Sequence, residues 1–178
     1  MRATGIIRRI DDLGRIVIPK EIRRTHHIRE GDPLELYVDK EGILFKKYSE
    51  LGALNGYADL CAKAMQQHFG ASVLVCDTDY VIAASTNLSS CRGKPFSEAL
   101  GNLIRSGKEY LHTEEGMPLL PFDRSDDKNT VQMVIPLRGT EGVNGGIVLL
   151  GSNSEAPQEM LVRSMRMAAA MLANLLVS

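Results

Sequence analysis

Residues 8–24 constrain the fold of this chain more than any other segment, because they set cations between short strand-forming runs. Six basic side chains fall within seventeen residues: Arg8, Arg9, Arg15, Lys20, Arg23 and Arg24. Gly14 predicts a turn in the middle of the segment, and Pro19 ends the second β-branched run. The arginines are therefore expected on a compact frame, which is what binding to a phosphate backbone requires.

Charge is distributed unevenly along the chain, although the net charge is only -1. Residues 1–30 hold eight Lys and Arg against four Asp and Glu, whereas residues 51–178 hold ten against thirteen. A basic end joined to an acidic remainder indicates that the first end meets a polyanion. The alternative is a solvated face that acidic residues partly neutralise, namely Asp11, Asp12, Glu21 and Glu30. The preference for Arg over Lys favours nucleic acid instead.

Residues 1–50 form the first predicted domain, made of short strands around one small helix. The expected elements are strands over 5–10 and 15–18, a helix over 20–25, and strands over 34–38 and 43–48. So short a domain, with no metal ligands and no disulfide, rarely buries enough surface to fold alone. The sequence therefore predicts an obligate dimer whose hairpins interleave and cover each other's edges.

Residues 51–178 form the second predicted domain, of the α+β class, with an antiparallel sheet and separate helices. The expected elements are a helix over 51–69 that ends at Gly70, strands over 72–76 and 80–84, a helix over 97–106 closed by Gly107, strands over 131–137 and 145–150, and a helix over 157–177. The Gly-rich run 139–146 lacks the Lys and Ser or Thr of a phosphate loop. It is interpreted as a hairpin loop with a tight turn at Asn144-Gly145.

The last helix is apolar nearly all round, so it is expected to be buried on more than one side. One side can face the sheet, and the other is expected to pack against the helix over 51–69 and the copy of that helix in a second chain. Two dimer contacts, one in each domain, would give a tetramer. The alternative is a helix sandwiched within one domain. Its longest apolar run, 167–173, is too short to cross a bilayer, and residues 1–5 do not resemble a signal peptide, so a soluble cytoplasmic protein is expected.

No cofactor, metal site or enzymatic activity is expected from the remaining residues. Cys61, Cys76 and Cys91 form no CxxC pair, and buried reduced thiols are the simplest interpretation. A thiol redox enzyme using Cys91, beside Arg92 and Lys94, is kept as an alternative. The long polar segment 86–127 fits either a lid over a small-molecule pocket or a cover whose own side chains fill that space.

The run from Thr4 through Gly14-Arg15-Ile16-Val17-Ile18-Pro19 to Thr25, continued by 31–38 and 46–48, resembles the AbrB-type swapped-hairpin DNA-binding domain of bacterial transition-state regulators. The whole chain resembles sporulation transcription regulators that join this domain to a GAF-like one. The resemblance implies a tetramer that binds double-stranded DNA, activates or represses sporulation genes and possesses a GAF-like sensor or oligomerisation domain.

By the same resemblance, DNA contact falls to Arg8, Arg15, Arg23 and Arg24, with Arg9 in support. Lys20, a further cation of the same cluster, is also expected to contact DNA. His26-His27 departs from the family, which usually has Leu after Arg-Arg-Thr. Phosphate contacts and DNA shape are expected to dominate, because no long recognition helix is present. An antitoxin-like interaction module is the alternative from another class.

Overall fold

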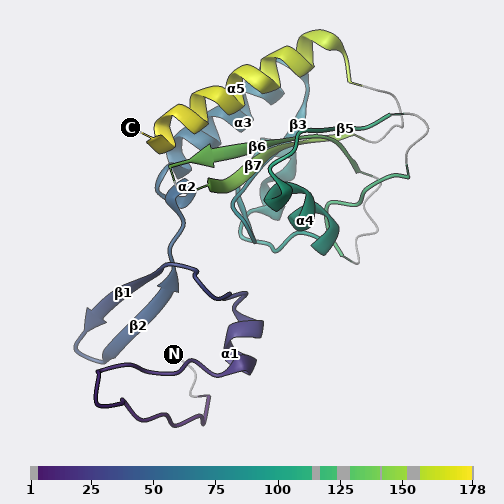
Figure 1. The fold of residues 1–178 in the computed structure, drawn as a ribbon. Helices are drawn as coiled ribbons and strands as arrows, with labels where there is room; N and C mark the ends of the chain where they lie inside the picture. The colour runs from purple at the N-terminus through teal and green to yellow at the C-terminus, as the bar shows by residue number, and fades with distance from the viewer. Residues whose placement is uncertain (1–3, 114–116, 124–128, 141, 152–156, 178) are drawn as a thin grey trace. The chain divides into compact units, whose positions relative to one another are not determined.

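A computed structural model describes residues 4–113, 117–123, 129–140, 142–151 and 157–177. The chain separates into two compact units, Met1–Tyr48 and Ser49–Ser178, called unit 1 and unit 2 below. Figure 1 shows the elements of both units, which are described here one at a time. Parts of the expected lid, 114–116 and 124–127, and the first three residues lie outside the described ranges.

Unit 1 contains one short helix and one hairpin. The elements are α1 (Lys20–Thr25), β1 (Leu34–Asp39) and β2 (Gly42–Lys47). The two strands pair antiparallel from Leu34↔Lys47 to Asp39↔Gly42. The strands predicted over 5–10 and 15–18 are not formed in the single chain. A strand is defined by the ladder it makes, and these residues find no ladder partner within the described part of their own subunit.

Unit 1 has no buried core: no residue that the structure describes between 4 and 48 is buried. Large apolar side chains instead lie exposed on it, among them Ile7, Leu13, Val17, Val38 and Ile43. Ile7 is 90% exposed and Val38 76%. Apolar exposure on this scale is typical of interaction surfaces.

Unit 2 is built on a five-stranded antiparallel sheet in the order β4-β3-β7-β6-β5. The strands are β3 (Ser72–Cys76), β4 (Val81–Ala84), β5 (Tyr110–Leu111), β6 (Thr130–Gly139) and β7 (Gly142–Gly151). The helices are α2 (Glu50–Ala53), α3 (Asn55–Phe69), the 3-10 helix η1 (Thr86–Cys91), α4 (Glu98–Ser106) and α5 (Glu159–Val177). The predicted α+β class, with hairpins forming an antiparallel sheet, is confirmed.

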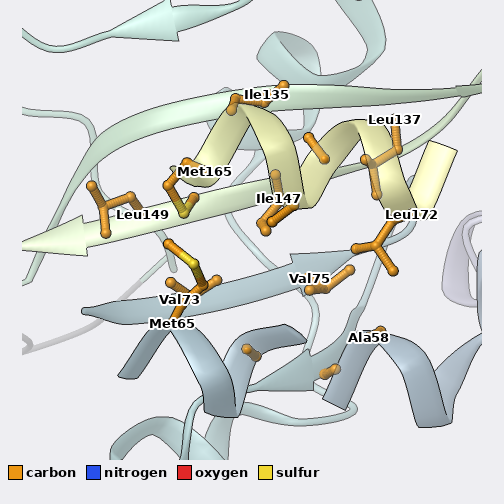
Figure 2. Packing of buried hydrophobic residues seen from close by; sticks show 14 of the residues in the cluster. Ala58, Met65, Val73, Val75, Ile135, Leu137, Ile147, Leu149, Met165 and Leu172 are labelled. Atoms are coloured by element: carbon orange, nitrogen blue, oxygen red, sulfur yellow. The ribbon is translucent and has the colours of Figure 1, made fainter. Parts of the chain in front are cut away.

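One face of the sheet packs against α3 and α5. Successive strand residues point to opposite faces, so Val73 and Val75 of β3 join this core while Leu74 lies on the other side. Figure 2 shows Val73 beside Met65 of α3 and Val75 farther along β3 on the side of Ala58, with Met165 of α5 in the same cluster. The cluster is continuous across both helices, so the sheet forms one layer and α3 and α5 form a second layer packed on it.

The opposite face is covered by η1, α4 and the segment after β5. Leu100 and Ile104 of α4 are fully buried there, next to Leu88 and Cys91 of η1. Leu119, Phe122 and four other half-buried side chains pack against the same cluster. The described part of segment 86–127 therefore contacts the sheet directly with its own side chains, as in the second of the two interpretations of its sequence.

The first helix of unit 2 is broken, although its apolar spacing predicts one continuous helix from 51 to 69. Leu54 ends α2, and the chain turns there before α3 begins. α2 packs on the β6–β7 hairpin through Leu51, which is fully buried, and through Glu50, which accepts a hydrogen bond from Asn144 Nδ2. β6 and β7 meet at Gly139↔Gly142, so Asn144 and Gly145 lie within β7 and the tight turn predicted for them is wrong.

The exposed side of α5 is apolar. Met160, Met167 and Met171 are each more than 60% exposed, and Tyr57 and Leu60 of the neighbouring α3 are similarly open. By length and composition α5 would suffice to cross a membrane, with a mean hydropathy of 1.4 and 28% of its apolar window buried in the structure. The apolar length is thus greater than the run 167–173 suggests. The inner side of α5 packs on the sheet like a core helix of a soluble domain.

Candidate nucleic-acid interface

The turn that carries Arg15 is held together by Asp11. Asp11 Oδ1 accepts hydrogen bonds from the backbone N–H of Leu13 (3.0 Å) and of Arg15 (2.8 Å). Asp11 Oδ2 accepts from Arg15 Nε at 2.7 Å. Backbone bonds close the same turn, since Asp11 N donates to Arg15 O and Gly14 N to Asp11 O. Gly14 sits at φ 74°, a left-handed conformation that a side chain would oppose.

These contacts change the titration of Asp11. The backbone N–H of Arg15 and then its side chain hold the pKa of Asp11 below the ordinary value of 3.8. A lowered pKa means that the bonds favour the charged carboxylate. Their contribution is complete above the unfolded pKa and is lost as the pH falls through the folded one. The turn therefore keeps its full set of contacts throughout the neutral range.

Arg8 and Arg9 lie on the arm that precedes this turn, and both are exposed. Neither side chain forms an ion pair with any residue that the structure describes. The expected placement of Arg8 beside Arg15 across a hairpin has no ladder to support it in the single chain. The structure instead brings Arg15 together with Asp11, within the turn itself.

Arg23 and Arg24 occupy the last turn of α1, where cations complement the helix dipole. Both side chains are exposed, as is Lys20 at the first helical position. The helix begins after Pro19, whose fixed φ suits an entry into a helix, and ends at Thr25, with His26 as its C-cap. Helix α1 was predicted over residues 20–25, and the structure confirms it.

The end of α1 is fixed by an unusual residue, His27, which adopts φ 53°. In that conformation Ile28 N donates to Arg23 O at 2.8 Å and His27 N to Arg24 O at 3.4 Å, which satisfies carbonyls that the helix leaves open. Lys47 Nζ contacts His27 O at 3.4 Å and pairs with Asp32 at 2.9 Å. The histidine pair that departs from the family thus caps the C-terminal end of α1, and the contact of Lys47 with His27 O connects this cap to β2.

Two features of this interface were missed from the sequence. Asp11 was expected in a turn over 11–14 and as a neutralising charge, but its bonds to Arg15 were not expected, although its spacing of four from Arg15 and the intervening Gly14 are a signal for a turn closed by its own side chain. His27 carries no such signal, because only its backbone conformation reveals its role. The geometry of a single chain does not test the DNA contacts, which remain predictions for Arg8, Arg9, Arg15, Lys20, Arg23 and Arg24.

The cysteines of unit 2 lie in apolar surroundings. Burial raises the pKa of Cys76 well above its ordinary value, with further contributions from Asp77 and Cys91, and burial also raises the pKa of Cys61. Cys91, expected in a loop, is only 6% exposed within the apolar cluster under α4. A buried thiol of this kind is not positioned as an accessible nucleophile.

An open hollow of about 470 Å³ lies on the surface of unit 2. It is lined by Lys63, Gln66 and Gln67 of α3 and by Thr86 of η1.

A small basic unit without a core, joined to an antiparallel sheet covered by helices, defines a two-domain class: an AbrB-type unit followed by a GAF-like unit. Residues 53–176 match the family "Stage V sporulation protein T C-terminal, transcription factor", and residues 7–50 match "Antidote-toxin recognition MazE, bacterial antitoxin". The chain is 39% identical to stage V sporulation protein T of Bacillus subtilis (strain 168), over 98% of both chains. It belongs to the family of that transcription factor, and not to a family of enzymes.

Two other similarities concern the units separately. Over 48 residues the chain is 60% identical to the transition state regulatory protein AbrB of the same organism, covering 27% of this chain and 50% of that protein. Unit 2 shares the fold of the GAF domain from Acinetobacter phosphoenolpyruvate-protein phosphotransferase, with a TM-score of 0.55 and 13% identity. That match covers 69% of this chain and 81% of the other.

Proposed function

We propose that this protein is a cytoplasmic DNA-binding regulator of sporulation genes, activating some and repressing others. Residues 1–50 contact the duplex as a dimer, and residues 51–178 join dimers into a tetramer. The observation that carries the proposal is a set of exposed cations on unit 1, in which no described residue is buried. Among the described residues, Arg15 is the only cation of this set that forms an ion pair. The proposed contacts are Arg8, Arg9, Arg15, Lys20, Arg23 and Arg24.

Salt dependence tests the DNA contacts. Each phosphate that is neutralised contributes about 0.9 to the slope of log affinity against log salt. Arg15→Ala removes one contact from each of two subunits, so the slope is expected to fall by about 2 for every sequence tested. Lys40→Ala, in the β1–β2 turn of the same unit, removes the same charge outside the proposed set and is expected to change the slope by much less. Binding that does not respond to salt contradicts the proposal.

The absence of buried residues from the described part of unit 1 supports pairing. Residues 4–18 expose apolar side chains on both sides of the Asp11–Arg15 turn and form no ladder in the described chain. Pairing with a second chain would cover these side chains and supply a ladder. The expected result is a full-length protein whose unit 1 signals in circular dichroism and NMR are lost together with dimerisation on dilution. A well-ordered unit 1 in a monomer contradicts this part of the proposal.

The exposed side of α3 and α5 supports the second contact. Apolar patches on monomeric proteins rarely exceed a few hundred Å², and this one runs along two neighbouring helices. Met167→Glu with Met171→Glu places charges at its centre without touching the sheet. The double variant is expected to reduce the tetramer to a dimer in analytical ultracentrifugation. A tetramer of unchanged stability would show that the patch is not the contact.

We further propose that assembly, rather than sensing of a small molecule, is the main task of unit 2. The support is the apolar cluster in which residues of η1, α4 and the segment after β5 pack directly on the sheet. A screen of metabolites by thermal shift is expected to find no stabilising compound. A ligand that raises the melting temperature in proportion to its concentration would restore the sensor interpretation.

The match of residues 7–50 to the antitoxin family favours one second candidate, an interaction module that neutralises a toxin. Against it stands the 39% identity with a sporulation transcription factor over the whole length. Purification from the native host separates the two candidates. A small protein bound in fixed ratio to unit 1 supports the antitoxin, whereas recovery of DNA fragments supports the regulator.

A further inference from the structure

Arg15 is the one cation of the proposed set whose side chain forms an ion pair among the described residues. Its Nε donates to Asp11 Oδ2 at 2.7 Å, while the two terminal nitrogens of the guanidinium meet no acceptor in the described part of the chain. The side chain of Arg15 is 69% exposed. The guanidinium is therefore held along one edge and left open at the other.

The same carboxylate also fixes the backbone that carries this guanidinium. Asp11 Oδ1 accepts the backbone N–H of Arg15, and Oδ2 accepts the side-chain Nε of the same residue. Two points of attachment to one carboxylate fix both the origin and the direction of the side chain. All these contacts lie within five consecutive residues, so pairing of unit 1 with a second chain is not needed to form them.

Energy is not the reason for this arrangement, because an exposed ion pair contributes little to stability. Its effect is on order: an arginine side chain carries rotamer freedom that must be lost when it meets a phosphate. A guanidinium already fixed by its Nε keeps its two terminal nitrogens as the pair of donors that matches a phosphate or the edge of a guanine.

The geometry points to Asp11 as a positioning residue for DNA binding: it holds Arg15 by Nε so that the terminal nitrogens face the duplex in a fixed direction. This inference rests on the proposed function and names one of its parts. Asp12 provides the contrast. It is adjacent, carries the same charge, and forms no ion pair with Arg15 in the described structure.

Asp11→Asn and Asp12→Asn make a matched pair for the test. Each substitution removes one negative charge from the same turn, so both variants gain the same nonspecific electrostatic attraction to DNA. In Asp11→Asn the new amide still accepts the backbone N–H groups through its oxygen, but its NH₂ group cannot accept from Arg15 Nε. With full-length protein and one duplex of fixed sequence at fixed salt, Asp11→Asn is expected to bind on the order of tenfold more weakly than Asp12→Asn, because one rotamer is released in each of two subunits.

Two further readouts separate positioning from a general structural role. In ¹⁵N NMR of the free protein, the Nε–H of Arg15 is expected to show slow exchange in the wild type and in Asp12→Asn, and to lose it in Asp11→Asn. In an Arg15→Ala background, the difference between the two Asn variants is expected to vanish, measured at low salt where weak binding is detectable.

Equal affinities of the two Asn variants would overturn the inference and leave Asp11 as a turn residue only. Tighter binding by Asp11→Asn than by Asp12→Asn would also overturn it, by showing that Asp11 masks Arg15. Failure of the proposed function looks different, because wild-type protein would then not bind DNA, or Arg15→Ala would bind as well as the wild type.

Discussion

Among the described glycines of unit 2, Gly145 is the one where an added methyl group is expected to be most disruptive. Gly145 lies in β7 where α2, β3 and β7 meet. A Cβ at this position would stand 2.7 Å from Leu51 Cδ2 and 3.0 Å from Asp77 Cα, and closer still to the carbonyl oxygen of Cys76. Two of these three neighbours are backbone atoms, so no side-chain rotation relieves the contact.

The cost follows from what has to move. β3 and β7 must part near the Cys76↔Gly146 pair, and Leu51, fully buried, must leave its position. Overpacking of a core costs about 1–3 kcal/mol, and each weakened ladder bond adds about 1 kcal/mol. The expected loss is therefore about 3 kcal/mol, which for a domain of this size lowers the melting temperature by roughly 10 °C.

Gly56→Ala is the matched control. Gly56 lies in the first turn of α3, where an added methyl group would meet no atom within 4 Å beyond the backbone of its own helix, and Ala favours the helix. The substitution is expected to raise stability by about 0.5 kcal/mol. Denaturant titration followed by circular dichroism at 222 nm reports mainly on α3 and α5 and so on unit 2. A Gly145→Ala protein within about 1 kcal/mol of the wild type would show that the sheet accommodates the added methyl group.

Three further predictions concern other contacts. His27→Gly is expected to stabilise unit 1 by about 0.5–1 kcal/mol, because φ 53° is strained for His and free for Gly. Denaturant unfolding of the protein at fixed concentration measures the change, and a loss of stability would contradict the expectation. In the native protein, a thiol reagent is expected to modify half-buried Cys61 before fully buried Cys76, whose raised pKa keeps the thiol protonated through neutral pH. Mass spectrometry of timed samples gives the order of modification, and modification of Cys76 first would contradict this expectation. Asn144→Asp is expected to loosen α2, because it places a second carboxylate against Glu50, and adding Glu50→Gln is expected to restore the hydrogen bond. Hydrogen exchange of the α2 amides measures the effect, and unchanged exchange in the single variant would show that this contact does not hold the helix.

Local signals predicted many of the elements well, because their causes lie within a few residues. Gly70 and Gly107 were expected to end helices, and both adopt left-handed conformations at the C-caps of α3 and α4. Ser97 was expected at the start of a helix, and its side chain accepts from the backbone of Leu100 at 3.2 Å. Caps of this kind are decided by local chemistry, which sequence displays directly.

Contacts between distant segments explain the errors. Asn144-Gly145 has the composition of a tight turn, but Gly145 is needed as a residue without a side chain so that Leu51 and Cys76 can approach β7. The break at Leu54 is invisible because the apolar spacing continues through it. Both outcomes depend on packing between elements far apart in the sequence, and packing overrides local propensity.

The proposed DNA interface shows the same division at smaller scale. The identity of the basic residues and the position of α1 could be predicted, since both follow from composition and from Pro19. The support of Arg15 by Asp11 is a matter of rotamers, and the conformation of His27 is a matter of backbone dihedrals. Neither is encoded in hydrophobic periodicity, which is the main source of structural information in a single sequence.

The exposed apolar side chains of unit 1 have a consequence for dosage in the cell. If unit 1 acquires its interior by pairing, as proposed above, its folding obeys mass action, so the fraction of DNA-binding molecules rises with total protein rather than staying constant. Occupancy of target promoters would then climb more steeply than expression itself, and a modest rise in synthesis would act as a threshold.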